Sequence, residues 1–333
     1  MTKVIDKPGT EKSIGSLAEQ IVAKAGAAMA EKNGERLYEG GKITEAGIWK
    51  KVPMSVYHSD CCPGPSISSS GLRQLTPPNG APLKYWDTSY LNPNRAPEEV
   101  QDYFSIGRAV HTLLLSEDGF RSEFVIRPSE WSDWRTKDAK EWRDKQVAAG
   151  KTVLVPDDLM NIQGMAERVA SDPTFAELLQ GRIERSVIWQ DEKTGVWLKS
   201  RPDSIPADGF IADLKTTTDA SDIGCQRSTL SYGYHMQLGL ACIGLEALTK
   251  RRVTDHVLLF IETKRPWAYN IKPIDPQMIY LGMRQLRAAI DVFADCFKSG
   301  NWPTYYGSGL TLSSPDWFDK QIEREPSIPQ EAA

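Results

Sequence analysis

The stretch FIADLKTTTDAS, residues 210–221, places an acidic and a basic residue two positions apart in an otherwise apolar segment. Side chains of a β-strand alternate between the two faces of its sheet. Asp213 and Lys215 therefore project from one face, while Ala212 and Leu214 project from the other and suit a hydrophobic core. We predict a strand here that carries a charged pair on one side.

A second acid, Asp203, lies upstream of Asp213, and the turn-forming stretch PADG separates them. A tight hairpin would bring the two carboxylates together, where they repel unless a positive charge lies between them. Such oxygen ligands favour a hard divalent cation such as Mg²⁺, with Lys215 beside it to orient a water molecule or a phosphate. The alternative interpretation is a surface hairpin that carries a solvated Asp–Lys pair.

The hydrophobic pattern around this strand predicts an α/β fold with a mixed sheet between helices. Residues 186–190, 196–201 and 210–216 are expected to form an antiparallel three-stranded meander. The other expected elements are helices at 103–115, 229–248 and 275–297, strands at 255–263 and 268–273, helical segments within 156–179 that break at Pro173, a short helix starting near 68–70, and a loop over 76–97. We divide the chain into an N-terminal appendage (1–50, with a helix around 16–31), a main domain (51–318) and an acidic flexible tail (319–333).

The chain has 333 residues, a net charge of −4 and 40% hydrophobic residues, an ordinary composition for a globular protein. A nucleic-acid partner would therefore have to bind a local positive groove. No apolar run is long enough to cross a bilayer, and the N-terminus is polar rather than signal-like. The five cysteines are odd in number and scattered, so we expect reduced thiols and a cytoplasmic protein.

Other motifs supply further candidate site residues. The motif SIGRAVHTLLL places His111 on an apolar helix, one turn after Gly107, which would clear space beside the imidazole. Together with the acids, His111 is a candidate for the same site, although a histidine on such a helix is more often a core residue. Tyr234 and Gln237 share one face of the helix after the strand, and Glu184 lies just before the first strand of the meander.

A tryptophan-rich segment, residues 127–145, is a candidate DNA contact. It interleaves tryptophans with arginines and lysines, a combination that grips single strands through stacking and phosphate contacts. Its acidic residues bring the net charge close to zero, so a solvated helix whose Trp face packs in the core is the alternative. We single out Arg135 and Lys137, and Arg201 beside the acidic site, as candidate phosphate contacts.

Taken in order, the motifs resemble the RecE-like exonuclease VIII family of phages and prophages, within the PD-(D/E)XK nuclease superfamily. The matching set is GxxxH (Gly107–His111), ExSVxW (Glu184–Trp189), TG…RPD (Thr194–Asp203), DLKTT (Asp213–Thr217) and YxYHxQ (Tyr232–Gln237). The stretches ISSSGLRQLTPP…KYW (67–86) and WPTY…SPDW (302–317) are also similar, so the resemblance covers about residues 52–318. Each motif alone is weak, and the combination is specific.

The resemblance implies a restriction-endonuclease-like PD-(D/E)XK core and a metal-dependent site. The matched metal ligands are His111, Asp203, Asp213 and the backbone carbonyl of Leu214, and the matched catalytic residues are Asp203, Asp213, Lys215, Gln237 and Glu184. The implied cofactor is Mg²⁺, with Mn²⁺ as a substitute. Related nucleases of RecB type carry a tyrosine four residues after the glutamine, where this chain has Ala241, so Tyr234 or Tyr232 would supply the ring that stacks on DNA.

By the same resemblance, we expect a Mg²⁺-dependent exodeoxyribonuclease that degrades double-stranded DNA ends from 5′ to 3′ in the cytoplasm of a bacterial host. The expected partners are a RecT-like single-strand annealing protein in phage-type recombination and further copies of the same chain. One alternative is a RecB-type nuclease of other polarity, whose iron–sulfur cluster would need a C-terminal cysteine group where only Cys296 is present. The other is a non-catalytic protein that binds DNA ends on a nuclease fold.

Overall fold

The computed structural model describes residues 34–76, 80–95, 103–115, 120–305, 311 and 313–324. The helix expected around 16–31 lies outside these residues. The strands are β1 (Arg36–Leu37), β2 (Gly47–Lys50), β3 (Ser66–Ser68), β4 (Phe124–Ile126), β5 (Thr152–Leu154), β6 (Arg182–Ile183), β7 (Ser186–Gln190), β8 (Trp197–Ser200), β9 (Ser204–Ile205), β10 (Phe210–Thr217), β11 (Asp255–Glu262) and β12 (Tyr269–Pro273). The helices are α2 (Met54–Tyr57), α3 (Ser69–Gln74), α4 (Pro82–Thr88), α5 (Tyr103–Leu115), α6 (Phe120–Glu123), α7 (Lys137–Ala148), α8 (Pro156–Ser171), α9 (Pro173–Leu178), α10 (Asp222–Ser231), α11 (Tyr234–Thr249), α12 (Pro276–Ser299) and α13 (Asp316–Arg324).

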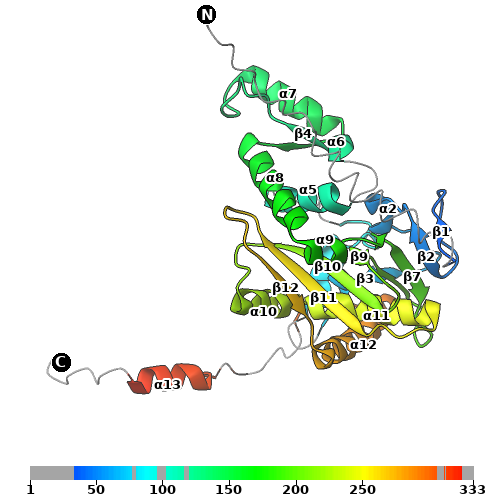
Figure 1. Ribbon diagram of the computed structural model, residues 1–333. Helices are drawn as coiled ribbons and strands as arrows, with labels where there is room; N and C mark the ends of the chain where they lie inside the picture. The colour runs from blue at the N-terminus through cyan, green and yellow to red at the C-terminus, as the bar shows by residue number, and fades with distance from the viewer. Residues whose placement is uncertain are drawn as a thin grey trace, which may run out of the picture.

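The sheet at the centre of the fold has the order β12-β11-β10-β9-β6 (Figure 1). Strands β10 and β11 are parallel along their whole length, while β12 and β9 run antiparallel to their neighbours. A second sheet has the order β1-β2-β7-β8-β3, and β4 pairs with β5 alone. The predicted α/β fold, with a mixed sheet flanked by helices, is confirmed.

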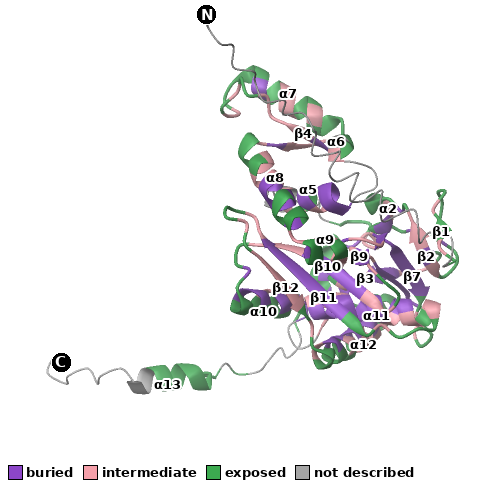
Figure 2. Ribbon diagram, viewed as in Figure 1, coloured by how far each residue is buried: buried purple, intermediate pink, exposed green. Residues whose placement is uncertain are grey.

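Alternate residues of β10 face two hydrophobic cores. Ile211 packs in a core that includes residues of α11 and α12, whereas Ala212 and Leu214 pack in a core that includes residues of α5 and α8. All three side chains are fully buried. Figure 1 shows α5 and α8 on one side of the sheet and α11 and α12 on the other, and Figure 2 shows the buried residues gathered in the strands between them. The strand is therefore enclosed on both faces, and the polar residues it carries lie within the protein.

The predicted three-stranded meander is wrong in its third strand. Strands β7 and β8 form the expected antiparallel hairpin, but the chain then leaves that sheet. Pro202 has no N–H to donate to a sheet ladder, and it lies in the break between β8 and β9. The short strand β9 joins the other sheet and pairs with β10 at Ser204 and Ala212. Asp203 consequently lies immediately before β9.

Two other expectations also differ from the structure. The helix expected over 229–248 is divided into α10 and α11 at Gly233, whose left-handed backbone (φ 64°) suits glycine. The loop expected over 76–97 contains helix α4, because Pro82 occupies its first turn, where the missing N–H costs no hydrogen bond. The break at Pro173 and the strands β11 and β12 are confirmed.

The two ends of the described chain can be compared with the predicted domain boundaries. Strand β2, within the predicted appendage of residues 1–50, pairs with β7 and so belongs to a sheet of the main domain. The acidic tail predicted for 319–333 begins inside α13, so residues 319–324 are helical. None of the helices in the described ranges combines the length and the apolar character needed to cross a membrane.

Candidate active site

Strand β10 sets Asp213 and Lys215 side by side, as the two-residue period predicts. The Nζ atom of Lys215 lies 2.7 Å from Oδ1 of Asp213. Both side chains are largely buried, with 12% of Lys215 and 1% of Asp213 exposed. The alternative of a solvated surface pair is therefore wrong, and the pair has to be explained as a buried site.

Asp203 reaches the same site from its position immediately before β9. Its Oδ2 accepts a hydrogen bond of 2.7 Å from the backbone N–H of Leu214, and its carboxyl group lies close enough to that of Asp213 for each to shift the pKa of the other. The pairing of β9 with β10 produces this approach, because Ser204 lies opposite Ala212. The two acids are thus adjacent, as expected, although the hairpin that joins them differs from the predicted meander.

Helix α11 closes the site with Gln237 and Tyr234. The amide of Gln237 bridges the charged pair: its Nε2 donates to Oδ2 of Asp213 at 2.8 Å, and its Oε1 accepts from Nζ of Lys215 at 3.0 Å. The ring centroid of Tyr234 lies 4.5 Å from Nζ of Lys215, a cation–π contact. Tyr232 is mostly exposed and packs on Tyr234, with 5.6 Å between ring centroids. The glutamine therefore fixes the orientation of both charged groups.

His111 approaches the acids from helix α5. Its Nδ1 lies 3.5 Å from Oδ2 of Asp203, so the structure brings His111 to the site and not into an apolar core. Gly107 has a different role from the one expected, because a Cβ there would lie 2.9 Å from Oγ1 of Thr216 on β10. The glycine lets α5 approach β10 closely and does not clear space for the imidazole.

The charges at the site are strongly coupled. Burial and the negative charge of Asp203 raise the pKa of Asp213 to about 8, and these effects outweigh the opposing contribution of Lys215. Burial opposes ionisation of Asp203, but His111 and Lys215 outweigh it and hold the pKa of Asp203 well below its ordinary value. Burial likewise opposes protonation of His111, and Asp203 outweighs it and raises the pKa of His111. With no further cation, the acid pair keeps one proton at neutral pH.

Glu184 lies beside these groups in an unusual backbone conformation. Its φ of 49° is left-handed, and its backbone N–H donates to the carbonyl of Asp203 at 3.0 Å. Burial, followed by the charge of Asp203, raises the pKa of Glu184. A strained residue held next to an acid pair is a pattern typical of functional sites.

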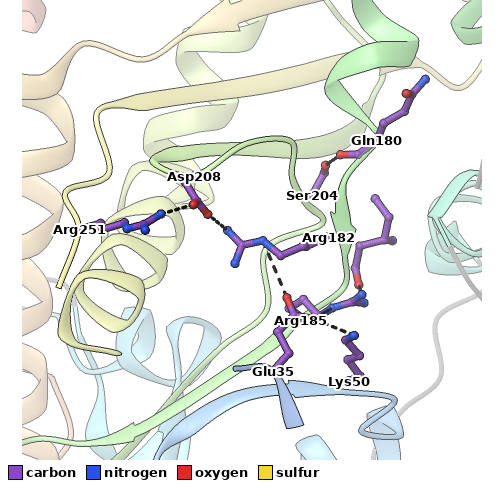
Figure 3. A network of polar contacts seen from close by, with 9 residues as sticks. Glu35, Lys50, Gln180, Arg182, Arg185, Ser204, Asp208 and Arg251 are labelled. Carbon is purple, nitrogen blue, oxygen red and sulfur yellow. Dashed lines mark hydrogen bonds and ion pairs between the residues drawn. The ribbon is translucent and has the colours of Figure 1, made fainter. Parts of the chain in front are cut away.

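Two arginines hold the segment that carries Glu184 (Figure 3). Arg185 donates from Nε to the carboxylate of Glu35 at 3.0 Å, and Arg182 pairs with Asp208 at 2.9 Å and lies 3.8 Å from Glu35. The side chain of Glu35 is only 1% exposed. Sequence reasoning missed Glu35, because its two arginine partners lie some 150 positions away and no local motif links them to it.

The three predicted DNA-contact cations lie apart from this cluster or are already bonded. Arg135 lies just before α7 and Lys137 is its first residue; both are exposed and pair with neighbouring carboxylates. Figure 1 shows α7 at the opposite end of the molecule from α11. The guanidinium of Arg201 donates to Oγ of Ser186 at 2.9 Å and to the backbone carbonyl of Val52 at 2.5 Å. The donors of Arg201 are thus used within the protein.

The predicted tryptophan face does not enter the core. Trp131 and Trp134 both pack against Trp142, with ring centroids 5.7 and 6.4 Å apart, and all three are partly exposed. The guanidinium groups of Arg127 and Arg143 lie over the ring of Trp134. The segment forms its own aromatic and cationic cluster.

The side chains at the site are chemically suited to bind a hard divalent cation. Among the described residues, no three His, Cys, Asp or Glu side chains converge into a ready-made metal shell. Asp203 and Asp213 nevertheless supply adjacent carboxylates, and His111 supplies a ring nitrogen beside them. Burial and the charge of Asp203 raise the pKa of Asp213, and a bound cation would oppose this shift by favouring the ionised pair.

Comparison with known proteins bears on the fold and on the family of the chain. The solved structures similar to the chain include a candidate exonuclease from Eubacterium rectale, at 12% identity and a TM-score of 0.51, which covers 82% of this chain and 96% of that one. They also include a phage-related exonuclease from Haemophilus somnus 129PT, at 12% identity and a TM-score of 0.28, which covers 50% of this chain and 85% of that one. A search of curated proteins found no match. Residues 86–311 match the model of a family described as a PDDEXK-like domain of unknown function (DUF3799), and the chain belongs to that family.

Proposed function

We propose that the protein is a Mg²⁺-dependent exodeoxyribonuclease that hydrolyses double-stranded DNA from its ends, 5′ to 3′. The observation that supports this most is the closed array of Asp203, Asp213, Lys215 and Gln237, in which every charged group is held by a direct hydrogen bond. A buried array of this kind is costly to the fold, and perturbed acids with a fixed lysine are typical of catalytic sites. The family membership supports the same nuclease chemistry.

Each residue of the array would have a separate role in hydrolysis. The oxygen of a water molecule bonds to phosphorus, the bond to the leaving sugar oxygen breaks, and a proton passes from the water to the leaving oxygen. Lys215 has three N–H donors, two of which are directed to Asp213 and Gln237, so the third can stabilise the incoming oxygen or a phosphate oxygen. Gln237 holds Lys215 and Asp213 in position, and Glu184 adds a buried carboxyl group whose pKa is raised by burial and by the charge of Asp203.

Asp203, Asp213, His111 and the carbonyl of Leu214 would hold Mg²⁺ or Mn²⁺. When bound, such an ion lowers the pKa of water and neutralises charge on the phosphate. Because Mg²⁺ keeps several waters and needs few protein ligands, an incomplete protein shell suits it.

The polarity and the requirement for ends are testable on one substrate. We expect a linear duplex to release labelled nucleotide from its 5′ end before its 3′ end, and a covalently closed circle of the same sequence to stay intact. Release from the 3′ end first would favour the RecB-type alternative. Tight binding to DNA ends without any release of nucleotide would favour the alternative of a non-catalytic end-binding protein.

Replacing His111 by alanine should raise the concentration of Mn²⁺ needed for half-maximal activity by about tenfold, because a ligand nitrogen is lost. The measurement is a metal titration of nucleotide release beside a melting curve. His256→Ala is the matched control, since His256 is a buried histidine that donates to or accepts from Sγ of Cys242 at 3.0 Å, away from the acids. We expect the control to lose stability, by roughly 1–3 kcal/mol, with no shift in the metal midpoint. An unchanged midpoint in His111→Ala would remove His111 from the metal site.

The affinity for Mn²⁺ should rise with pH between about 6 and 8. The acid pair keeps a proton below the pKa of Asp213, near 8, and a cation that binds there must displace it. Apparent affinity should therefore increase by up to about tenfold per pH unit, then level off above that pKa. Calorimetry in buffers of different ionisation enthalpy would count the released proton. Affinity that is flat across this range, with no proton released, would show that the acid pair does not bind the ion.

The wider setting follows the family resemblance. We infer that the enzyme acts in the cytoplasm of a bacterial host, in phage-type recombination, beside a RecT-like annealing protein, and that copies of the chain assemble around DNA. Sedimentation with and without a linear duplex tests the assembly. A pull-down with a purified annealing protein tests the partner.

A further inference from the structure

Arg73, on helix α3, is a partly buried cation without a partner. Its Nε is buried and has no hydrogen-bond acceptor, and no hydrogen bond or ion pair joins its guanidinium to the residues that the structure describes. Two other arginines, Arg127 and Arg287, also have a buried Nε without a hydrogen-bond acceptor. Arg287 pairs with Asp191 and Asp291, and Arg127 lies over the ring of Trp134 at 5.3 Å. Arg73 differs from both, because nothing described in the protein balances its charge.

The side chain of Arg73 lies next to the active site. Its stem packs on Gly233, so a Cβ at residue 233 would lie only 2.6 Å from Cδ of Arg73. The next residue is Tyr234, whose ring lies 4.5 Å from Nζ of Lys215. Arg73 and Tyr234 are also close enough to influence each other's pKa. One aromatic ring therefore separates the unpaired guanidinium from the proposed catalytic lysine.

An arginine in this position is costly unless it has a ligand. Burying the Nε–H donor of Arg73 without an acceptor opposes folding, so such donors are normally paired. The planar fork of donors matches the non-bridging oxygens of a phosphate. The glycine at residue 233 contributes to the arrangement, because any side chain there would push Arg73 away from Tyr234.

Building on the nuclease activity proposed above, we propose that Arg73 is a substrate-positioning residue that binds a phosphate group of the DNA strand next to the scissile one. The phosphate has two possible sources, the terminal 5′-phosphate of the strand or an internal phosphodiester. Either would neutralise the guanidinium and draw the strand across Tyr234 toward Lys215. The sequence offered only the motif SSSGLR as a signal, and its arginine could not be distinguished from a surface residue before α3 was seen to pack on α11.

The test compares Arg73→Gln, Arg73→Lys and the wild type. DNA affinity is measured by fluorescence anisotropy in EDTA, so that no cleavage intervenes, on duplexes with a 5′-phosphate or a 5′-hydroxyl, from about 50 to 200 mM KCl. We expect Arg73→Gln to bind about tenfold more weakly, and its plot of log affinity against log salt to be shallower by about 1. In turnover with Mg²⁺, KM should rise while kcat changes little. Arg73→Lys keeps the charge and the stem, so it should keep the salt slope and lose only part of the affinity.

The two duplexes distinguish the source of the phosphate. A loss confined to the 5′-phosphorylated duplex identifies the terminal phosphate, and an equal loss on both identifies an internal one. Arg251→Gln is the control, because Arg251 is an exposed arginine between α11 and β11 that pairs with Asp208; it should behave as wild type. Wild-type affinity and salt slope in Arg73→Gln, with only a lower melting temperature, would overturn the role of Arg73. If Arg73→Gln does not fold, full affinity of Arg73→Lys on both duplexes would overturn it.

These outcomes are separate from a failure of the nuclease activity. A wild type that binds DNA but never cleaves it leaves the anisotropy comparison intact. If the wild type cleaves DNA and the Arg73 variants bind DNA as tightly as the wild type does, only the proposed role of Arg73 is contradicted.

Discussion

Replacing Lys215 by alanine is expected to lower kcat by about 100- to 1,000-fold, the cost of removing one preorganised donor from a charge-stabilising site. Lys215 is held between Asp213 and Gln237, at 2.7 and 3.0 Å, and lies over the ring of Tyr234. Its position is thus fixed before substrate binds. Because this donor acts on charge that develops during the reaction, kcat should fall far more than DNA affinity.

The matched control is Lys272→Ala, on β12 of the same sheet, where the lysine pairs with the exposed Asp222. That variant should keep wild-type turnover, since surface ion pairs contribute little. Single-turnover cleavage and anisotropy on the same duplex give the two quantities. Near-normal cleavage with poor binding in Lys215→Ala would make Lys215 a docking residue and contradict its place in catalysis.

Replacing Glu35 by glutamine is expected to lower the free energy of unfolding by about 3–5 kcal/mol, the cost of breaking a buried ion cluster from one side. The buried carboxylate of Glu35 forms ion pairs with three cations: Arg185 at 3.0 Å, Lys50 at 3.2 Å and Arg182 at 3.8 Å (Figure 3). Glutamine keeps the shape and removes the charge, so the nearly buried guanidinium of Arg185 loses this counter-ion, and that of Arg182 keeps only its pairing with Asp208 among the two carboxylates. Because Arg182 and Arg185 flank Glu184, nuclease activity should fall as well.

Glu45→Gln provides the comparison for this stability change. Glu45 is exposed and pairs with Arg36 at the surface, so its loss should change stability by less than about 1 kcal/mol. Urea denaturation measures both variants, and an unchanged m-value shows that the same transition is compared. A change of similar size in the two variants would contradict the role of the buried cluster.

The geometry around β10 was predictable because it depends on local pattern. The two-residue period of a strand places Asp213 with Lys215 and buries Ala212 and Leu214, whatever the rest of the chain does. The helical period similarly places Tyr234 and Gln237 on one face, and the structure brings both to Lys215. Features that depend on a single strand or helix can thus be predicted from the spacing of the side chains along that element.

Features that depend on long-range pairing could not be predicted in the same way. The transfer of β9 into a second sheet is decided by which neighbour satisfies its backbone, and the pattern of residues 196–216 is equally compatible with a meander. Two of the three cations paired with Glu35, Arg182 and Arg185, lie about 150 residues away, and its role is visible only when β1, β2 and the β6–β7 segment are in place. The part Gly107 plays is likewise set by the distance between α5 and β10.

The most direct measurement is release of acid-soluble nucleotides from a linear duplex by the wild type and by Asp213→Asn, each with Mg²⁺ and with excess EDTA. Asparagine keeps the size of the side chain and removes the raised acid, so the variant should fold at least as well as the wild type. We predict release by the wild type with Mg²⁺, none in EDTA, recovery when Mg²⁺ is restored, and none from Asp213→Asn under any condition. Release that persists in EDTA, or that is undiminished in a folded Asp213→Asn variant, would contradict hydrolysis at this site.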